Sequence, residues 1–178
     1  VRSRHPNAVI LEKEPCTFKV FLRALRVHQW MKNILVFAPL VLAHQIFNPQ
    51  GWLVAGAAAL AFSLCASGVY LLNDLLDLEA DRRHPRKKKR PCASGVFPLS
   101  FALTLAPLLF LAAFGVALAI QPEFAVVLGI YLILTSAYSY RLKALALVDV
   151  ILLAILYTIR IVGGGVATGI HLSQWLLG

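Results

Sequence analysis

Long apolar runs dominate the pattern of hydrophobic and polar positions along this chain. Runs of about 20 apolar residues, the length that crosses a bilayer core as a helix, recur between short polar loops. We expect the first run to be short, with an extended start, and a sixth to begin near Leu172. The pattern predicts an all-α integral membrane bundle with about five spans, over residues 33–47, 52–72, 99–120, 124–140 and 145–168.

The residues before the first span are polar or amphipathic. Residues 17–32 mix apolar side chains such as Phe18 and Leu25 with basic ones such as Arg23, the pattern of a helix that lies in a membrane interface. Residues 1–16 are polar and predict a tail or linker, because no signal-peptide pattern is present. We expect residues 17–178 to be the N-terminal part of a transmembrane domain whose later spans are missing from this fragment.

Composition and charge support a membrane protein. The chain is 60% hydrophobic and 14% charged, whereas soluble domains are about half apolar and a quarter charged. Seven Lys and Arg residues precede the first span, seven follow the second and two follow the fourth. The positive-inside rule therefore places the N-terminus and the loop after the second span in the cytosol, in a cytoplasmic membrane. Three cysteines without close spacing indicate neither disulfides nor a zinc site.

An acidic helical face follows the second span, in the stretch YLLNDLLDLEADRRHPRKKKRP over residues 70–91. At about 100° per residue, Asn73, Asp74, Asp77 and Asp81 share an arc of roughly 100°, whereas Glu79 points to the opposite side. Within that face little neutralises the carboxylates. Mg²⁺ prefers oxygen ligands and usually binds one or two carboxylates plus substrate phosphates. The seven basic residues that follow can hold phosphate oxygens.

Simpler interpretations of this stretch remain open. The acids could pair with the neighbouring bases, and the basic loop could only follow the positive-inside rule or bind anionic lipid. A transporter or channel using Asp149 and Arg160 would leave the acidic face unexplained. A scaffold that binds lipid or nucleic acid through the basic loop predicts no loss on changing Asp77 to Asn. The shared face of three aspartates favours a magnesium-dependent enzyme over both.

Ionisable residues also occur within or beside the later spans. Lys143, Asp149 and Arg160 belong to this group, and such residues usually face a cavity that has a function. Asp149 and Arg160 are about three turns apart on one helix face, and Tyr157 lies one turn before Arg160. A structural ion pair with a neighbouring helix is the alternative. The three glycines at 163–165 allow close helix packing or a backbone break.

The ordered string Asn73-Asp74-x-x-Asp77-x-x-x-Asp81-Arg82-x-His84-Pro85-x-Lys87-x-x-Arg90-Pro91 resembles the first aspartate-rich motif of the UbiA superfamily of intramembrane prenyltransferases. The stretches RALRVHQWMKN and YSYRLKALALVDVILLAILYTIRIVGGGVATG resemble the entry helix and the fourth-to-fifth helix region of that family. QWMKN, FSLCASGVYLLND and IRIVGGGVATGIHLSQW are most similar to the branch that includes decaprenyl-phosphate phosphoribosyltransferases. The resemblance covers residues 18–178.

The resemblance implies a nine-helix bundle around a lateral, lipid-open cavity, with Mg²⁺ and diphosphate bound at its cytosolic side. A second acidic motif is expected beyond the end of this chain, so the fragment alone should be inactive. Asp74, Asp77 and Asp81 would bind the metal and act in catalysis, with Asn73 as a ligand or orienting group. The other substrate-binding residues that the resemblance implies are Arg82, Lys87 and Arg90 at the diphosphate, and Lys32, Lys143, Tyr157 and Arg160 in the polar cavity.

Two reactions fit this resemblance. The favoured one moves a phosphoribosyl group from phosphoribosyl diphosphate to a polyprenyl phosphate, as in cell-wall precursor synthesis. The other moves a prenyl group from its diphosphate to an aromatic or other acceptor. Both expel diphosphate from a carbon that becomes cation-like, so Mg²⁺ and basic residues would stabilise the leaving group. The expected partners are a polyprenyl lipid, the bilayer and a soluble diphosphate substrate, with no nucleic-acid or protein partner.

Overall fold

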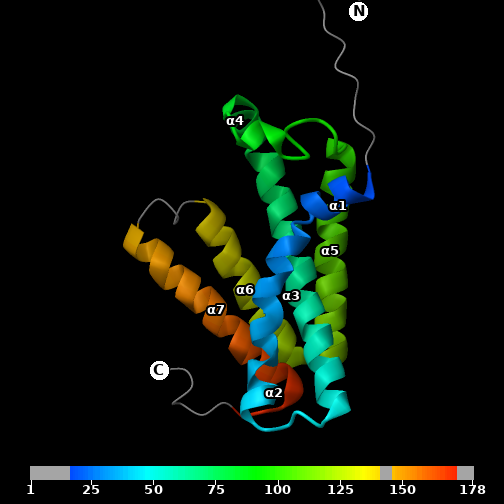
Figure 1. Cartoon of the computed structure of the whole chain (residues 1–178), viewed down its shortest axis with the longest axis vertical. Coiled ribbons are helices and arrows are strands. Elements are labelled where there is room, and N and C mark those ends of the chain that lie inside the picture. The colour runs from blue at the N-terminus through cyan, green and yellow to red at the C-terminus, as the bar shows by residue number, and fades with distance from the viewer. Residues whose placement is uncertain (1–16, 141–145, 172–178) are drawn as a thin grey trace, which may run out of the picture.

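The computed structural model describes residues 17–140 and 146–171, and every regular element in those ranges is a helix (Figure 1). Within them, four helices are long and apolar enough to cross a membrane. These confirm the all-α membrane fold and the predicted spans from 52–72 onward. The predicted tail and the start of the sixth span fall outside the described residues. The four long helices are α3 (Pro49–Leu76), α5 (Leu99–Ile120), α6 (Pro122–Tyr140) and α7 (Ala146–Thr168).

The first predicted span takes a different form from the one expected. It consists of η1, a 3₁₀-helix of 11 residues (Val27–Phe37), and α2, a five-residue α-helix (Ala38–Leu42). A 3₁₀-helix rises about 2.0 Å per residue and an α-helix about 1.5 Å, so the two together cover about 30 Å. That distance is close to the thickness of the hydrocarbon core. The prediction of a span over 33–47 was wrong in its bounds, because η1 begins at Val27 and α2 ends at Leu42. The 3₁₀ section rises further per residue than an α-helix, so a short segment with a more extended start covers this distance.

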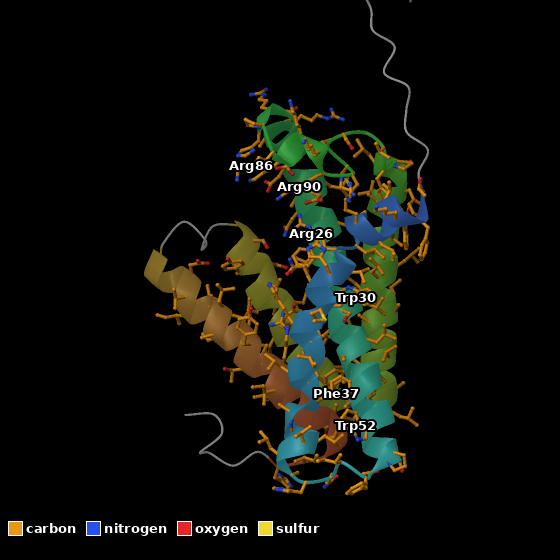
Figure 2. The ribbon with its side chains drawn as sticks, viewed as in Figure 1. Arg26, Trp30, Phe37, Trp52, Arg86 and Arg90 are labelled. Atoms are coloured by element: carbon orange, nitrogen blue, oxygen red, sulfur yellow. The ribbon has the colours of Figure 1, made fainter. Side chains whose placement is uncertain are left out.

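Packing against two long helices holds η1 in this unusual form. η1 lies against both α3 and α7. A Cβ atom at Gly164 would overlap the Val36 carbonyl oxygen, so the backbones of α7 and η1 are in direct contact. A Cβ at Gly163 would likewise overlap the Phe62 ring, so these two glycines serve close packing, and α7 continues through residues 163–165 without a break. Elsewhere along η1, Trp30 Nε1 donates to Ser67 Oγ at 3.1 Å, and the Phe37 ring stacks on Trp52 (Figure 2).

The predicted interfacial helix over 17–32 is much shorter than expected. α1 spans Phe18–Ala24, and Arg26 then adopts a left-handed backbone conformation with φ of 52°. This conformation is uncommon for residues other than glycine, and it turns the chain from α1 into η1. The Arg26 side chain bonds Asp74 of α3, an interaction that the turned backbone permits. The contact with α3 thus accompanies the end of the helix at Ala24, although the amphipathic pattern of the sequence continues to residue 32.

Small residues bring α3 and α5 together, and the two run side by side (Figure 1). The side of α5 that is buried carries alanines at positions 102, 106, 113 and 117, which allow close approach between membrane helices.

With 28 residues, α3 is about 42 Å long, longer than the hydrocarbon core, so its last turns can reach the polar region. The chain continues there into α4 (Leu78–Arg83) and η2 (Lys87–Lys89). α7 leans away from α3 toward this end, which lies opposite α2 (Figure 1).

Candidate active site

The three aspartates of the acidic motif occupy different environments. Asp74 lies near the end of α3 and Asp81 in α4, and both are buried, with 2% and 1% of their surface exposed. Asp77 is exposed and forms the junction between the two helices, where the backbone leaves helical geometry. The continuous helical face predicted from the sequence is therefore interrupted at Asp77. Asn73 points toward α6, where its Nδ2 donates to Ser139 Oγ at 2.8 Å.

Two arginines pair with the buried aspartates. Arg26 Nη2 lies 2.6 Å from Asp74 Oδ1, and Arg90 Nη1 lies 2.6 Å from Asp81 Oδ2 and 3.3 Å from Asp74 Oδ1. Figure 2 shows both arginines at the acidic end of α3. The expectation that little neutralises the acidic face was wrong, and the alternative in which the acids pair with nearby bases is confirmed for these two carboxylates. No local pattern indicated Arg26 as a partner, because it lies 48 residues before Asp74.

The carboxylate oxygens of Asp74 and Asp81 are of the kind that binds a magnesium ion. Asp81 Oδ1 is buried and has no hydrogen-bond partner in the part of the chain that the structure describes, and the nearest ammonium group, of Lys87, is 4.0 Å away. Asp74 and Asp81 supply only oxygen, as Mg²⁺ prefers. One guanidinium nitrogen of Arg90 bridges the two carboxylates. Within residues 17–140 and 146–171, no three acidic, His or Cys side chains are grouped as a metal site, so substrate oxygens would have to complete the coordination.

A strongly basic cavity adjoins Asp74. It has a volume of about 390 Å³ and mixes one carboxylate with five Arg and Lys side chains. Such a concentration of positive charge suits phosphate groups. Of the three predicted diphosphate residues, only Arg90 lines it. Arg82 Nε instead donates to the Ala93 carbonyl. The lining residues are Arg23, Arg26, His28, Asp74, Arg86, Lys89, Arg90 and Pro91.

A second, smaller cavity lies deeper, among η1, α3, α6 and α7, and has a volume of about 140 Å³. The predicted residues Lys32, Tyr157 and Arg160 all line it, whereas Lys143 lies outside the described residues. Asp149 does not line it, and the Asp149 Oδ1 atom is buried with no hydrogen-bond partner in the described chain. The complete lining is Lys32, Tyr70, Tyr131, Thr135, Tyr138, Ser139, Leu153, Leu156, Tyr157 and Arg160.

Arg160 is buried at the centre of a polar network that joins four elements. Its Nε donates to Asn33 Oδ1 at 2.9 Å, its Nη2 donates to the Tyr131 hydroxyl at 3.1 Å, and its Nη1 donates to the Leu156 carbonyl. Asn33 in turn donates to Ser63 of α3 at 2.7 Å. No carboxylate pairs with Arg160 among the residues described. The alternative of a structural ion pair is thus wrong within those residues, and the cavity interpretation fits the observed contacts.

Comparison with known proteins agrees with this arrangement. Residues 34–178 match the UbiA prenyltransferase family. The chain belongs to the UbiA prenyltransferase family. Members of this family are membrane transferases, and the four apolar helices agree with an integral membrane protein.

Relatives and solved structures of the UbiA family resemble this chain over most of its length. It is 42% identical over 166 residues to the decaprenyl-phosphate phosphoribosyltransferase of Corynebacterium glutamicum, covering 88% of this chain and 48% of that enzyme. It is also 42% identical over 158 residues to the protein y4nM of Sinorhizobium fredii, covering 89% and 31%. A UbiA homologue from Archaeoglobus fulgidus, solved with GPP and Mg²⁺, shares the fold at a TM-score of 0.69 and 21% identity, over 89% and 57%. The chain thus spans at most about half the length of these curated relatives.

A buried cysteine, Cys92, lies in the loop that follows η2, within electrostatic range of Asp74 and Arg26. Cys92 is 1% exposed. Burial raises the pKa of its thiol from 9.0 to about 11, and the nearby Asp74 carboxylate adds to the rise, whereas Arg26 opposes it. The thiol is therefore protonated at neutral pH and packs as an apolar group in the buried cluster that includes Leu71 and Phe97.

Proposed function

We propose that this chain belongs to a phosphoribosyltransferase that moves the phosphoribosyl group of phosphoribosyl diphosphate to a polyprenyl phosphate. The observation that carries the proposal is the lining of the larger cavity beside Asp74. Seven of its eight lining residues are polar or charged and only Pro91 is apolar. A sugar diphosphate suits such a lining, whereas an isoprenoid chain would need apolar walls next to its diphosphate. The 42% identity to a decaprenyl-phosphate phosphoribosyltransferase supports the same choice.

Each part of the site has a role in this reaction. Asp74 and Asp81 would hold Mg²⁺, which neutralises charge on the departing diphosphate. Arg26 and Arg90 already contact these carboxylates and are within reach of a phosphate group in the same cavity. Arg23, Arg86 and Lys89 form no ion pair within the described residues, so their charges are available to the diphosphate. Ser139 fixes the direction of Asn73, which orients the metal or the substrate.

The bond changes follow from this arrangement. An oxygen of the lipid phosphate forms a bond to the anomeric carbon of the ribose. The bond from that carbon to the diphosphate oxygen breaks, and the electron pair leaves with the diphosphate. The basic cavity stabilises the charge that develops on the leaving group, which is where such stabilisation lowers the barrier most. No proton has to be removed from the lipid phosphate, because it attacks as an anion.

The orientation of the protein follows from the donor. Phosphoribosyl diphosphate is soluble, so the basic cavity must open to an aqueous compartment. We infer that the end with α1, α4 and η2 faces the cytosol, in line with the concentration of Lys and Arg there. We propose the transferase activity for the complete protein, with residues 17–178 as the N-terminal part of the transferase domain and a second acidic motif supplied by the remainder.

The test supplies both candidate substrate pairs to membranes that contain the complete protein and Mg²⁺. One reaction contains phosphoribosyl diphosphate labelled in the ribose and a polyprenyl phosphate. The other contains a labelled polyprenyl diphosphate and an aromatic acid acceptor. We expect label to enter the lipid phase in the first reaction only. Transfer in the second reaction alone would overturn the proposal in favour of prenyl transfer.

A further inference from the structure

A further cavity, which we call the α1 cavity, lies between α1, η2 and the loop that follows η2. Its volume is about 380 Å³. It shares Arg23, Lys89 and Pro91 with the basic cavity beside Asp74, whereas its other lining residues do not line that cavity. The α1 cavity is thus a separate space on the far side of two cations. Its lining residues are Val20, Arg23, Lys89, Pro91, Ser94 and Val96.

The α1 cavity carries positive charge that the described residues leave unpaired. Arg23 and Lys89 form no ion pair with any of them, and no acidic side chain of the described chain lines the cavity. Guanidinium and ammonium groups that meet without an acid attract an anion, and phosphate oxygens suit both. Ser94 Oγ donates to the Pro91 carbonyl at 3.2 Å, so its oxygen can still accept a bond from a hydroxyl donor.

The α1 cavity lies at the depth of lipid headgroups. α5 has 22 residues and is about 33 Å long, close to the thickness of the hydrocarbon core, so its first residue lies near the edge of that core. Val96 lies just before that residue. Figure 1 shows α1 across the same end of α5, and the Phe21 ring lies 6.3 and 6.5 Å from the rings of Phe97 and Phe101. These contacts hold α1 at the boundary between hydrocarbon and water.

The other half of the lining is apolar. Val20, Pro91 and Val96 supply it. On the two helices that meet here, Phe18 of α1 is 73% exposed and Phe101 of α5 is 46% exposed, as expected for aromatic side chains that insert into lipid. A soluble sugar diphosphate gains nothing from apolar walls, whereas the glycerol and acyl part of a lipid does. Cations beside apolar walls at this depth therefore favour a phospholipid over a soluble anion.

We propose that the α1 cavity binds the phosphate group of an anionic phospholipid from the leaflet around α1. The phosphate lies between Arg23 and Lys89, and a hydroxylated headgroup reaches Ser94. The glycerol lies against Val20 and Val96, and the acyl chains continue past α5 into the hydrocarbon. This lipid is neither donor nor acceptor in the transfer reaction, so the inference does not rest on the proposed function.

The test titrates the complete protein in detergent with short-chain lipids and measures lipid binding by native mass spectrometry. The probes are dioctanoyl phosphatidylglycerol, which is anionic, and dioctanoyl phosphatidylcholine, which has the same chains and no net charge. Inorganic phosphate is added in competition, because it is a free source of the same anion.

Two pairs of variants separate this cavity from the general positive charge at this end of the bundle. Val96→Glu places a carboxylate in the cavity, and Val96→Gln has the same shape without the charge. Lys89→Gln removes a lining cation, whereas Lys88→Gln removes an exposed neighbour that does not line the cavity. Thermal unfolding reports any loss of folding, which should affect the two variants at position 96 alike.

We expect the wild type to bind phosphatidylglycerol about tenfold or more tightly than phosphatidylcholine, because each cation near an anionic lipid contributes about fivefold. Val96→Glu should abolish this preference, and Val96→Gln should keep it. Lys89→Gln should reduce the preference about fivefold, and Lys88→Gln should change it by less than about twofold.

Equal affinity of the wild type for the two lipids would overturn the proposal, and so would a preference that survives in Val96→Glu. A loss as large in Lys88→Gln as in Lys89→Gln would assign the lipid to the general charge of the loop instead. Inorganic phosphate that displaces phosphatidylglycerol at equal concentration would overturn the lipid as the source of the anion.

Lipid binding does not require turnover, so the two proposals fail separately. A transfer assay without phosphoribosyl product would refute the proposed function and leave the lipid site standing. Transfer by a protein that shows no preference between the two lipids would refute the lipid site and leave the reaction standing.

Discussion

Arg26 and Asp74 are 48 residues apart in the sequence, yet Arg26 Nη2 lies 2.6 Å from Asp74 Oδ1. The contact joins the turn between α1 and η1 to the last turns of α3. It also places a guanidinium group beside one of the two buried carboxylates that we assign to Mg²⁺. The position of the entry segment and the charge of the acidic site thus depend on the same ion pair.

Replacing Arg26 with Gln should destabilise the protein measurably. The Asp74 side chain is 3% exposed, and removing one charge-assisted hydrogen bond to it costs about 2 kcal/mol. Arg83→Gln is the matched control, because Arg83 and Glu79 lie 4.0 Å apart and both are more than 80% exposed. That surface pair should contribute little. Thermal unfolding in detergent measures both, and equal shifts in Tm would contradict the importance of the buried pair.

The contact between η1 and α7 predicts a contrast between two glycines. Gly164→Ala should destabilise the bundle by about 1–3 kcal/mol, because its Cβ would overlap the Val36 carbonyl oxygen of η1. A Cβ at Gly56, within α3, meets no atom within 4 Å. Gly56→Ala should therefore leave stability unchanged or raise it by up to about 1 kcal/mol. Thermal unfolding of the two variants decides the matter, and a Gly164→Ala protein as stable as the wild type would contradict the close packing.

The raised pKa of Cys92 predicts slow alkylation. With the thiol pKa raised from 9.0 to about 11, the thiolate fraction at pH 7.5 falls about 100-fold, and burial slows the reaction further. Because folding disfavours the thiolate, this group's contribution to stability is complete below pH 9 and is lost as the pH rises toward 11. Maleimide labelling followed by peptide mass spectrometry should show Cys92 unreacted in the folded protein and reacted in denaturant. Rapid labelling of folded protein at pH 7.5 would contradict this environment.

The sequence predicted the parts of the fold and site that depend on local composition. Span lengths from α3 to α7 follow from the apolar runs, and the cavity around Arg160 follows from the cost of an ionisable residue within such a run. The 3₁₀ form of η1 could not be predicted, because it depends on the approach of Gly164 to Val36. Arg26 was missed for a similar reason, since its partner lies in a distant helix. The binding roles of the predicted residues stay predictions.

The most direct test of the central claim compares phosphoribosyl transfer by the wild type, Asp81→Asn and Glu79→Gln at saturating Mg²⁺. Asp81 is buried beside Arg90, whereas Glu79 lies on the exposed side of the same helix. Incorporation of labelled ribose into polyprenyl phosphate by the complete protein gives the rates. The account predicts a loss of about 100-fold or more for Asp81→Asn and a rate close to the wild type for Glu79→Gln. Equal rates for the three proteins would contradict a role for the acid–arginine site in the reaction.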